Sequence, residues 1–203
     1  FWLFQIESGS AKDILLTKIA FISENEMRKP VLSNLEEPPL NIALSGAEVA
    51  LKDNKTTGRF LSQDYTLNYD HLDTTEQIIS RLDELYQQGF HYFVMDLQAK
   101  TLLDVLSNAP KDILLFNARA KENNLRLEVC DHRLLHTMPS YAMLTDALTQ
   151  FMVLKRWKDW FMISGAEYED QLFATSLKES AQKFGAKIVE DKIWDGARDA
   201  RRS

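Results

Sequence analysis

The sequence has one cysteine, no long apolar run and no excess of positive charge. Cys130 has no second cysteine to pair with, which excludes an internal disulfide and any metal site built from several cysteines. No apolar run approaches the roughly 20 residues that span a bilayer. The 203 residues include 24 basic and 30 acidic side chains, whereas nucleic acid and anionic membranes require a concentrated basic face. With 45% hydrophobic and 27% charged residues, the composition is that of a globular protein that binds no nucleic acid.

Sequence motifs for catalysis and for cofactors are also missing. The phosphate-binding signatures G-x-G-x-x-G and G-x4-G-K-[ST] and the nucleophile elbow G-x-S-x-G do not occur. Cys130, His132 and His136 have metal-like residue types, but a closed zinc site needs four ligands. We interpret Cys130 as a core residue and His136 as a hinge residue whose ring bonds to backbone. Asp96 lacks a second carboxylate or lysine at a fixed spacing, so we predict no enzyme, no metal and no cofactor.

Short apolar runs alternate with helical patterns along the first half of the chain. Such alternation predicts an α/β fold with a parallel, doubly wound sheet and right-handed crossovers. Asn54 and Gly58 are good terminators of the first helix, while Thr74 and Gln77 form a capping pair before the second. The expected strands cover 14–23, 60–69, 90–97 and 113–117, and the expected helices cover 40–54, 75–88 and 99–110.

The stretch 113–160 organises the rest of the chain. It predicts a strand, a polar loop, a short strand ending in His-Thr-Met-Pro-Ser and a long helix, with Phe151, Leu154 and Trp157 on the packed face of that helix. A strand, a helix closed by Gly185 and a further strand follow, and such a unit with exposed edges is not an independent lobe. We therefore expect a signal-peptide remnant, a complete first α/β lobe, a crossing helix and the start of a truncated second lobe, over 1–11, 12–140, 141–159 and 160–203.

A candidate site follows from the expected sheet. Ligands on doubly wound sheets bind outside the carboxyl ends of the strands, where the strand order switches. An aromatic side chain after the strand that ends at Gly165 can close over such a ligand. We expect the hinge at His136, Thr137 and Pro139. The residues that we expect to contact the ligand are Gln98, Ala99, Lys100, Thr101, Asn117, Ala118, Arg119, Ala120 and Tyr168.

Four stretches carry a resemblance: LSGAEVALKDNKTTGRFL, ILLFNARAKENNLRLEVC, LLHTMPSYAMLTDALTQFMVLKRW and FGAKIVEDKIW. The pattern resembles type 1 periplasmic binding proteins of the leucine/isoleucine/valine-binding class. Within that class it is most similar to substrate-binding proteins of pyrroloquinoline-quinone-dependent alcohol oxidation systems. The resemblance implies an exported, periplasmic protein that clamps a small-molecule solute between two lobes and presents it to the membrane permease of an ABC transporter. It also implies a functional link to a quinoprotein alcohol dehydrogenase.

In amino-acid-binding members of that class, serine and threonine hydroxyls and backbone amides hold the ligand. The corresponding loops here, LQAKTLL and FNARAKENN, contain only Thr101 of that kind, while Lys100 and Arg119 favour an anionic or polar group. Two alternatives stay open. One is a ligand-sensing regulatory or receptor domain of the same fold, and the other is an α/β enzyme that uses Asp96 or His136.

Overall fold

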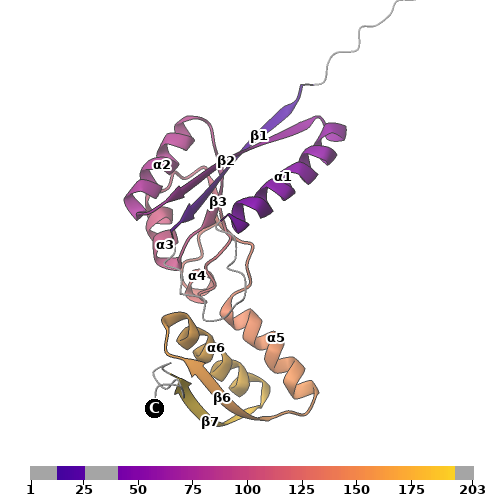
Figure 1. Cartoon of the computed structure of the whole chain (residues 1–203), viewed down its shortest axis with the longest axis vertical. Coiled ribbons are helices and arrows are strands. Elements are labelled where there is room, and N and C mark those ends of the chain that lie inside the picture. Colours follow the sequence, from indigo (N-terminus) through magenta and orange to yellow (C-terminus); the bar gives the residue numbers. More distant parts are fainter. Residues whose placement is uncertain (1–12, 26–40, 195–203) are drawn as a thin grey trace, which may run out of the picture.

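The computed structural model describes residues 13–25 and 41–194 and contains two parallel sheets. The larger sheet has five strands in the order β2-β1-β3-β4-β5, and the smaller one pairs β6 with β7 (Figure 1). The expected α/β class with a parallel, doubly wound sheet is confirmed. The proposed signal-peptide remnant at 1–11 lies outside the described residues.

The five-stranded unit follows the alternation in the sequence. Consecutive strands are joined by helices because parallel strands need a crossover connection. A short helix that the sequence did not predict, α4, lies between the last two strands. The elements are β1 Leu15–Glu24, α1 Ile42–Leu61, β2 Gln63–Leu72, α2 Thr75–Gln87, β3 Tyr92–Asp96, α3 Ala99–Asn108, β4 Leu114–Asn117, α4 Asn124–Leu127 and β5 Leu134–His136.

The core of this unit lies around the central strands. Ala20 and Ile22 of β1 and Phe93 and Met95 of β3 are completely buried against α2 and α3. β1 and β2 continue beyond β3, which joins β1 only from Ile19 onward, and α1 lies along that extension (Figure 1). Central strands buried on both faces are expected in a sheet with helices on both sides.

The predicted end of the first helix is wrong. α1 continues through Leu61, so β2 begins at Gln63 and not at residue 60. Asn54 does not stop the helix, and its Nδ2 donates to the Ala50 carbonyl oxygen one turn earlier at 2.8 Å. Gly58 is buried where the helix meets β2, and a Cβ there would lie 2.6 Å from the Gln63 oxygen. Close packing, rather than a turn, therefore requires this glycine.

The two-stranded unit comprises α5 Tyr141–Leu154, β6 Asp159–Gly165, α6 Tyr168–Phe184 and β7 Lys187–Trp194. The predicted packed face of the long helix is wrong. Phe151 and Leu154 are 52% and 78% exposed, and Trp157 lies beyond the helix end with 60% exposure. Small side chains make the α5–α6 contact instead and allow close approach of the helices, among them Thr145, Thr149, Ala174, Ser176, Ser180 and Ala181.

Two further sequence interpretations have clear outcomes. The capping box at Thr74 and Gln77 is confirmed, because each side chain bonds the other residue's backbone N–H.

The interpretation of Cys130 as a core residue is wrong. Its side chain is exposed, and the residue adopts a φ of 37° at the turn before β5. That turn is fixed by Asp131, which accepts hydrogen bonds from both the backbone and the side chain of Arg133.

Candidate functional site

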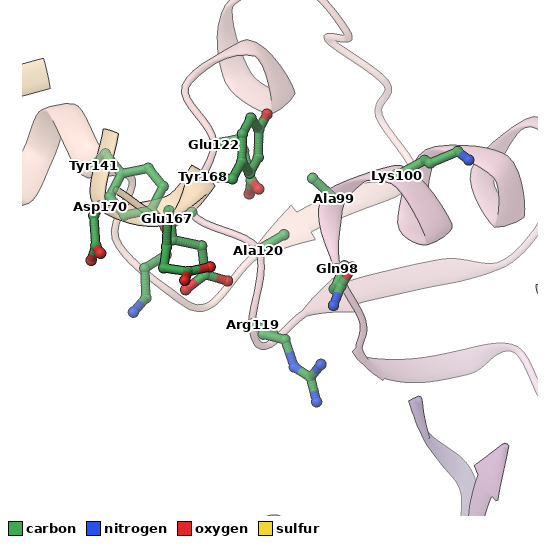
Figure 2. A pocket seen from close by; sticks show the side chains of 12 residues that line it. Gln98, Ala99, Lys100, Arg119, Ala120, Glu122, Tyr141, Glu167, Tyr168 and Asp170 are labelled. Carbon is green, nitrogen blue, oxygen red and sulfur yellow. The ribbon is translucent and has the colours of Figure 1, made fainter. Parts of the chain in front are cut away.

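A cavity of about 500 Å³ lies at the carboxyl-terminal edge of the five-stranded sheet and faces the start of α6 (Figure 2). The loops after β3 and β4 form one wall. The first turns of α5 and α6 form the other, which we call the α6 wall. The lining residues are Gln98, Ala99, Lys100, Arg119, Ala120, Lys121, Glu122, Tyr141, Glu167, Tyr168, Glu169 and Asp170.

The structure brings six of the nine predicted contact residues together in this cavity: Gln98, Ala99, Lys100, Arg119, Ala120 and Tyr168. Thr101, Asn117 and Ala118 do not line it. Thr101 is buried on α3, and Asn117 is completely buried at the end of β4. Ala118 continues the sheet, since its N–H donates to the Met95 carbonyl oxygen at 2.9 Å.

Asn117 shapes the loop that carries the cavity residues after β4. Its Oδ1 accepts from the backbone N–H groups of Arg119 and Ala120 at 3.2 and 2.9 Å. Its Nδ2 donates to the Ala120 carbonyl oxygen at 2.7 Å and to His136 Nδ1 at 3.0 Å. All positions of the carboxamide are therefore used within the protein, and Asn117 acts on the cavity through backbone geometry.

Arg119 is held by two carboxylates at the switch in strand order between β1 and β3. Its Nε donates to Asp96 Oδ1 at 2.7 Å, and its Nη1 lies 3.7 Å from Glu24 Oε1. Glu24 also accepts a hydrogen bond from the backbone N–H of Gln98. The three charged side chains are only 11–25% exposed. The positive charge of Arg119 is thus balanced by protein carboxylates on this wall.

The α6 wall combines aromatic and acidic side chains, and Figure 2 shows Tyr141, Glu167 and Asp170 close together on it. Tyr141 is only 9% exposed, and its ring meets Phe173 edge to face at a centroid distance of 6.1 Å. Burial, together with the nearby Glu169 and Glu122 carboxylates, raises the pKa of Tyr141 to about 12. Its phenol therefore stays protonated at neutral pH.

The predicted hinge segment is tied to the five-stranded unit at several points. The N–H and the hydroxyl of Thr137 both donate to the Asn117 carbonyl oxygen, at 3.0 and 2.9 Å. Arg126 donates to the Met138 carbonyl oxygen, and the Tyr141 N–H donates to the Lys121 carbonyl oxygen at 2.9 Å. Pro139 lies between these anchors, so the path of the crossing is well defined. The role of the segment in lobe rotation stays a prediction.

His136 lies at the start of this crossing with its ring partly buried. Burial is the main cause that lowers the pKa of His136, and the positive charge of Arg126 lowers it further. A backbone hydrogen bond at Leu125 acts in the opposite direction and raises the pKa. Because Asn117 Nδ2 donates to Nδ1, that nitrogen must be unprotonated, in agreement with the lowered pKa. Over residues 13–25 and 41–194, no group of three or more histidine, cysteine or acidic residues is arranged to hold a metal ion.

The sequence reasoning missed six lining residues: Lys121, Glu122, Tyr141, Glu167, Glu169 and Asp170. Half of them flank Tyr168, so the acidic start of α6 was visible as the run EYED. Nothing in the sequence indicates that Tyr141 lies across from the β3 and β4 loops, because its position depends on the crossing segment.

Comparisons with known proteins bear on the fold. No protein-family model matches the chain, and neither does any curated protein. Solved structures match over nearly the whole chain, at low identity. An ABC transporter substrate-binding protein from Desulfitobacterium hafniense in complex with Leu has a TM-score of 0.65 and 12% identity, over 94% of this chain and 54% of that one. A branched-chain amino acid ABC transporter periplasmic ligand-binding protein from Burkholderia xenovorans has a TM-score of 0.67 and 16% identity, over 90% and 47%.

A putative branched-chain amino acid ABC transporter from Rhodospirillum rubrum matches with a TM-score of 0.68 and 11% identity, over 93% of this chain and 53% of that one. The fold is therefore that of the type I periplasmic binding proteins. The chain spans about half the length of these structures.

Proposed function

We propose that the chain is the solute-binding component of an ABC-type uptake system and clamps a small molecule between two α/β lobes. The observation that carries the proposal is the cavity between the loops after β3 and β4 and the first turn of α6. Its two walls belong to different sheets, so relative motion of the sheets opens or closes it. The proposed contact residues on the two walls are the six of the nine predicted residues that line the cavity: Gln98, Ala99, Lys100, Arg119, Ala120 and Tyr168.

The proposed mechanism needs binding and closure but no reaction, so the chain is not an enzyme in this account. A ligand that touches both walls makes contacts in the closed state that it cannot make in the open state. It therefore binds the closed state more tightly, and this difference in binding free energy shifts the population toward closure. His136, Thr137 and Pro139 would act as the hinge, as a few residues between rigid elements absorb the rotation. The hydrogen bonds of Thr137 to Asn117 would define the fixed side of that hinge.

The proposed partner is the membrane permease of an ABC transporter, and the proposed location is the periplasm after export. Support comes from solved structures of the same fold, which are named as ABC transporter substrate-binding and periplasmic ligand-binding proteins. Within the described part of the chain, no helix has the length and apolarity to cross a bilayer. The link to pyrroloquinoline-quinone-dependent alcohol oxidation is a finer proposal that rests on the sequence resemblance alone.

A thermal-shift screen tests the proposed function. The panel contains amino acids, carboxylic acids, amines, alcohols and quinone-related compounds. A solute at a hundredfold excess over its dissociation constant adds about 2.7 kcal/mol to the free energy of unfolding. We expect the shift to fall in the Tyr168→Ala variant, since this 71% exposed ring lines the cavity. Phe161→Ala, which removes an exposed ring outside the cavity, is the control. A chain that no solute stabilises would contradict the proposal.

A further inference from the structure

The charge of the cavity is unevenly distributed between its walls. Arg119 is already balanced by Asp96 and Glu24, which leaves Lys100 and Lys121 as the basic residues of the lining. Four carboxylates also line it: Glu167, Glu169 and Asp170 on the α6 wall, and Glu122 beside Lys121 in the loop after β4. The described lining also contains no Val, Leu, Ile, Met or Phe side chain. Such a cavity disfavours an apolar side chain and a net negative charge in its occupant.

Tyr141 supplies an independent observation on the α6 wall. The residue is only 9% exposed, and its hydroxyl, which is not closed off from the cavity, makes no hydrogen bond within the described part of the chain. A hydroxyl that opens onto a cavity without a protein partner can bond to water or to a ligand. The neutral phenol oxygen, with the charges of Glu169 and Glu122 nearby, can accept a hydrogen bond from a positively charged donor. A ligand N–H group would supply that missing partner.

Helix electrostatics alone does not account for this wall. Acidic residues in the first turn of a helix are stabilised by the helix dipole, which explains Glu169 and Asp170 without any ligand. The dipole of α6 does not explain Glu122, which comes from the other unit and lines the same cavity. Nor does it explain the unpaired hydroxyl of the largely buried Tyr141 side chain. The acidic side chains of both units and a hydroxyl acceptor therefore meet at one place.

We propose that the cavity takes a small solute of net positive charge, an amine or guanidinium compound, whose cationic group lies between Tyr141, Tyr168 and the carboxylates of the α6 wall. Aromatic faces and carboxylates together form a favourable environment for a cation. Gln98 and the backbone of the loop after β4 face the rest of the solute. The inference rests on the proposed function and specifies its substrate class.

Calorimetric titration of the whole chain tests the inference with four probes. Putrescine and agmatine carry two positive charges, leucine is a zwitterion with an apolar side chain, and succinate is a dianion. We expect the two cations to bind, leucine and succinate not to bind, and the affinity for the cations to fall with added salt. Binding of leucine or succinate without binding of a cation would overturn the inference and leave the proposed function standing. Failure of all four probes, together with a silent thermal-shift screen, would overturn both.

Variants locate the cation in the cavity. Tyr141→Phe removes only the hydroxyl, so we expect about tenfold weaker binding of putrescine with no loss of stability of the free chain. Glu169→Gln should weaken binding by a similar factor. Glu179→Gln removes the same charge from an exposed position on the same helix outside the cavity, and it should leave the affinity unchanged. Equal losses in Glu169→Gln and Glu179→Gln would indicate a nonspecific acidic surface and overturn the inference.

Discussion

Asn117 Nδ2 lies 3.0 Å from His136 Nδ1 and joins the end of β4 to the end of β5, where the chain leaves the five-stranded sheet. The same carboxamide fixes the loop that carries Arg119 and Ala120 into the cavity. The residue that shapes one wall is therefore bonded to the residue that starts the crossing toward the other wall. A change at either position is expected to reach both the cavity and the crossing.

Protonation of His136 is expected to destabilise the fold. The pKa of His136 is lowered in the folded chain, so its neutral form is favoured there. The stability that comes from the neutral ring is fully present above the pKa of about 6.5 that histidine has in the unfolded chain. It is lost as the pH falls from there toward the folded pKa, because the unfolded chain then binds more protons. Urea unfolding at pH 7.5 and 5.5 measures this loss. His136→Gln should reduce the pH dependence, whereas His132→Gln, at an 86% exposed side chain, should not.

Removal of the Asn117 side chain should destabilise the chain and weaken solute binding together. Asn117→Ala leaves the N–H groups of Arg119 and Ala120 without their acceptor in a buried place, and we expect a loss of about 3 kcal/mol. Asn54→Ala removes a side-chain hydrogen bond on the exposed surface of α1 and should change stability by less than about 1 kcal/mol. Similar losses in both variants would contradict the central role of Asn117.

The two glycines of α1 should respond to alanine with opposite signs. Gly58→Ala places a Cβ 2.6 Å from the Gln63 carbonyl oxygen, so the helix must move away from β2, and we expect a loss of about 2 kcal/mol. Gly46→Ala meets nothing within 4 Å and should gain about 0.5–1 kcal/mol from helix propensity. Chemical unfolding of both variants gives the comparison. A stabilised Gly58→Ala variant would show that α1 does not pack as described.

Arg133 is expected to stabilise the turn before β5 through charge and hydrogen bonds. It lowers the pKa of Asp131 to about 2 and donates to the carbonyl oxygens of Leu106, Ala109 and Pro110. The ionised Asp131 contributes about 1 kcal/mol to the free energy of unfolding after solvent screening. This contribution is present above the usual pKa of about 3.8 and is lost as the pH falls through about 2.

The Arg133→Lys variant tests this contribution. It should cost about 1–3 kcal/mol, because lysine lacks the guanidinium fork, and it should flatten the acid dependence. Urea unfolding between pH 2 and 5 is the measurement, with Arg59→Lys as control at an exposed site. An unchanged acid profile in Arg133→Lys would contradict the assignment.

Much of the fold could be predicted because its signals are local. Apolar runs at strand length, the capping pair at Thr74 and Gln77, and Gly185 after α6 act within a few residues of the chain. The errors occurred where tertiary contacts decide. Gly58 has the residue type of a turn, and only its contact with β2 shows the need for close packing. Phe151 has the residue type and spacing of a core position, but it is 52% exposed.

The candidate site also combines residues that local signals predict with residues that only tertiary contacts reveal. Strand ends mark the edge of a parallel sheet, so Gln98 and Arg119 could be placed at the rim from the order of elements alone. Tyr141 and Glu122 could not, because their approach depends on how the crossing segment is bonded to the loop after β4. That the carboxamide of Asn117 faces inward to the loop, and not into the cavity, also requires the hydrogen-bond geometry.

Hydrogen exchange tests most directly whether one solute binds both walls. The solute that most stabilises the chain is added, and amide protection is compared with that of the free chain at 98–101, 119–122 and 167–170. We expect increased protection in all three segments, because the cavity residues of both units contact the same molecule. Protection confined to one wall, or to segments outside the cavity, would contradict the two-walled clamp.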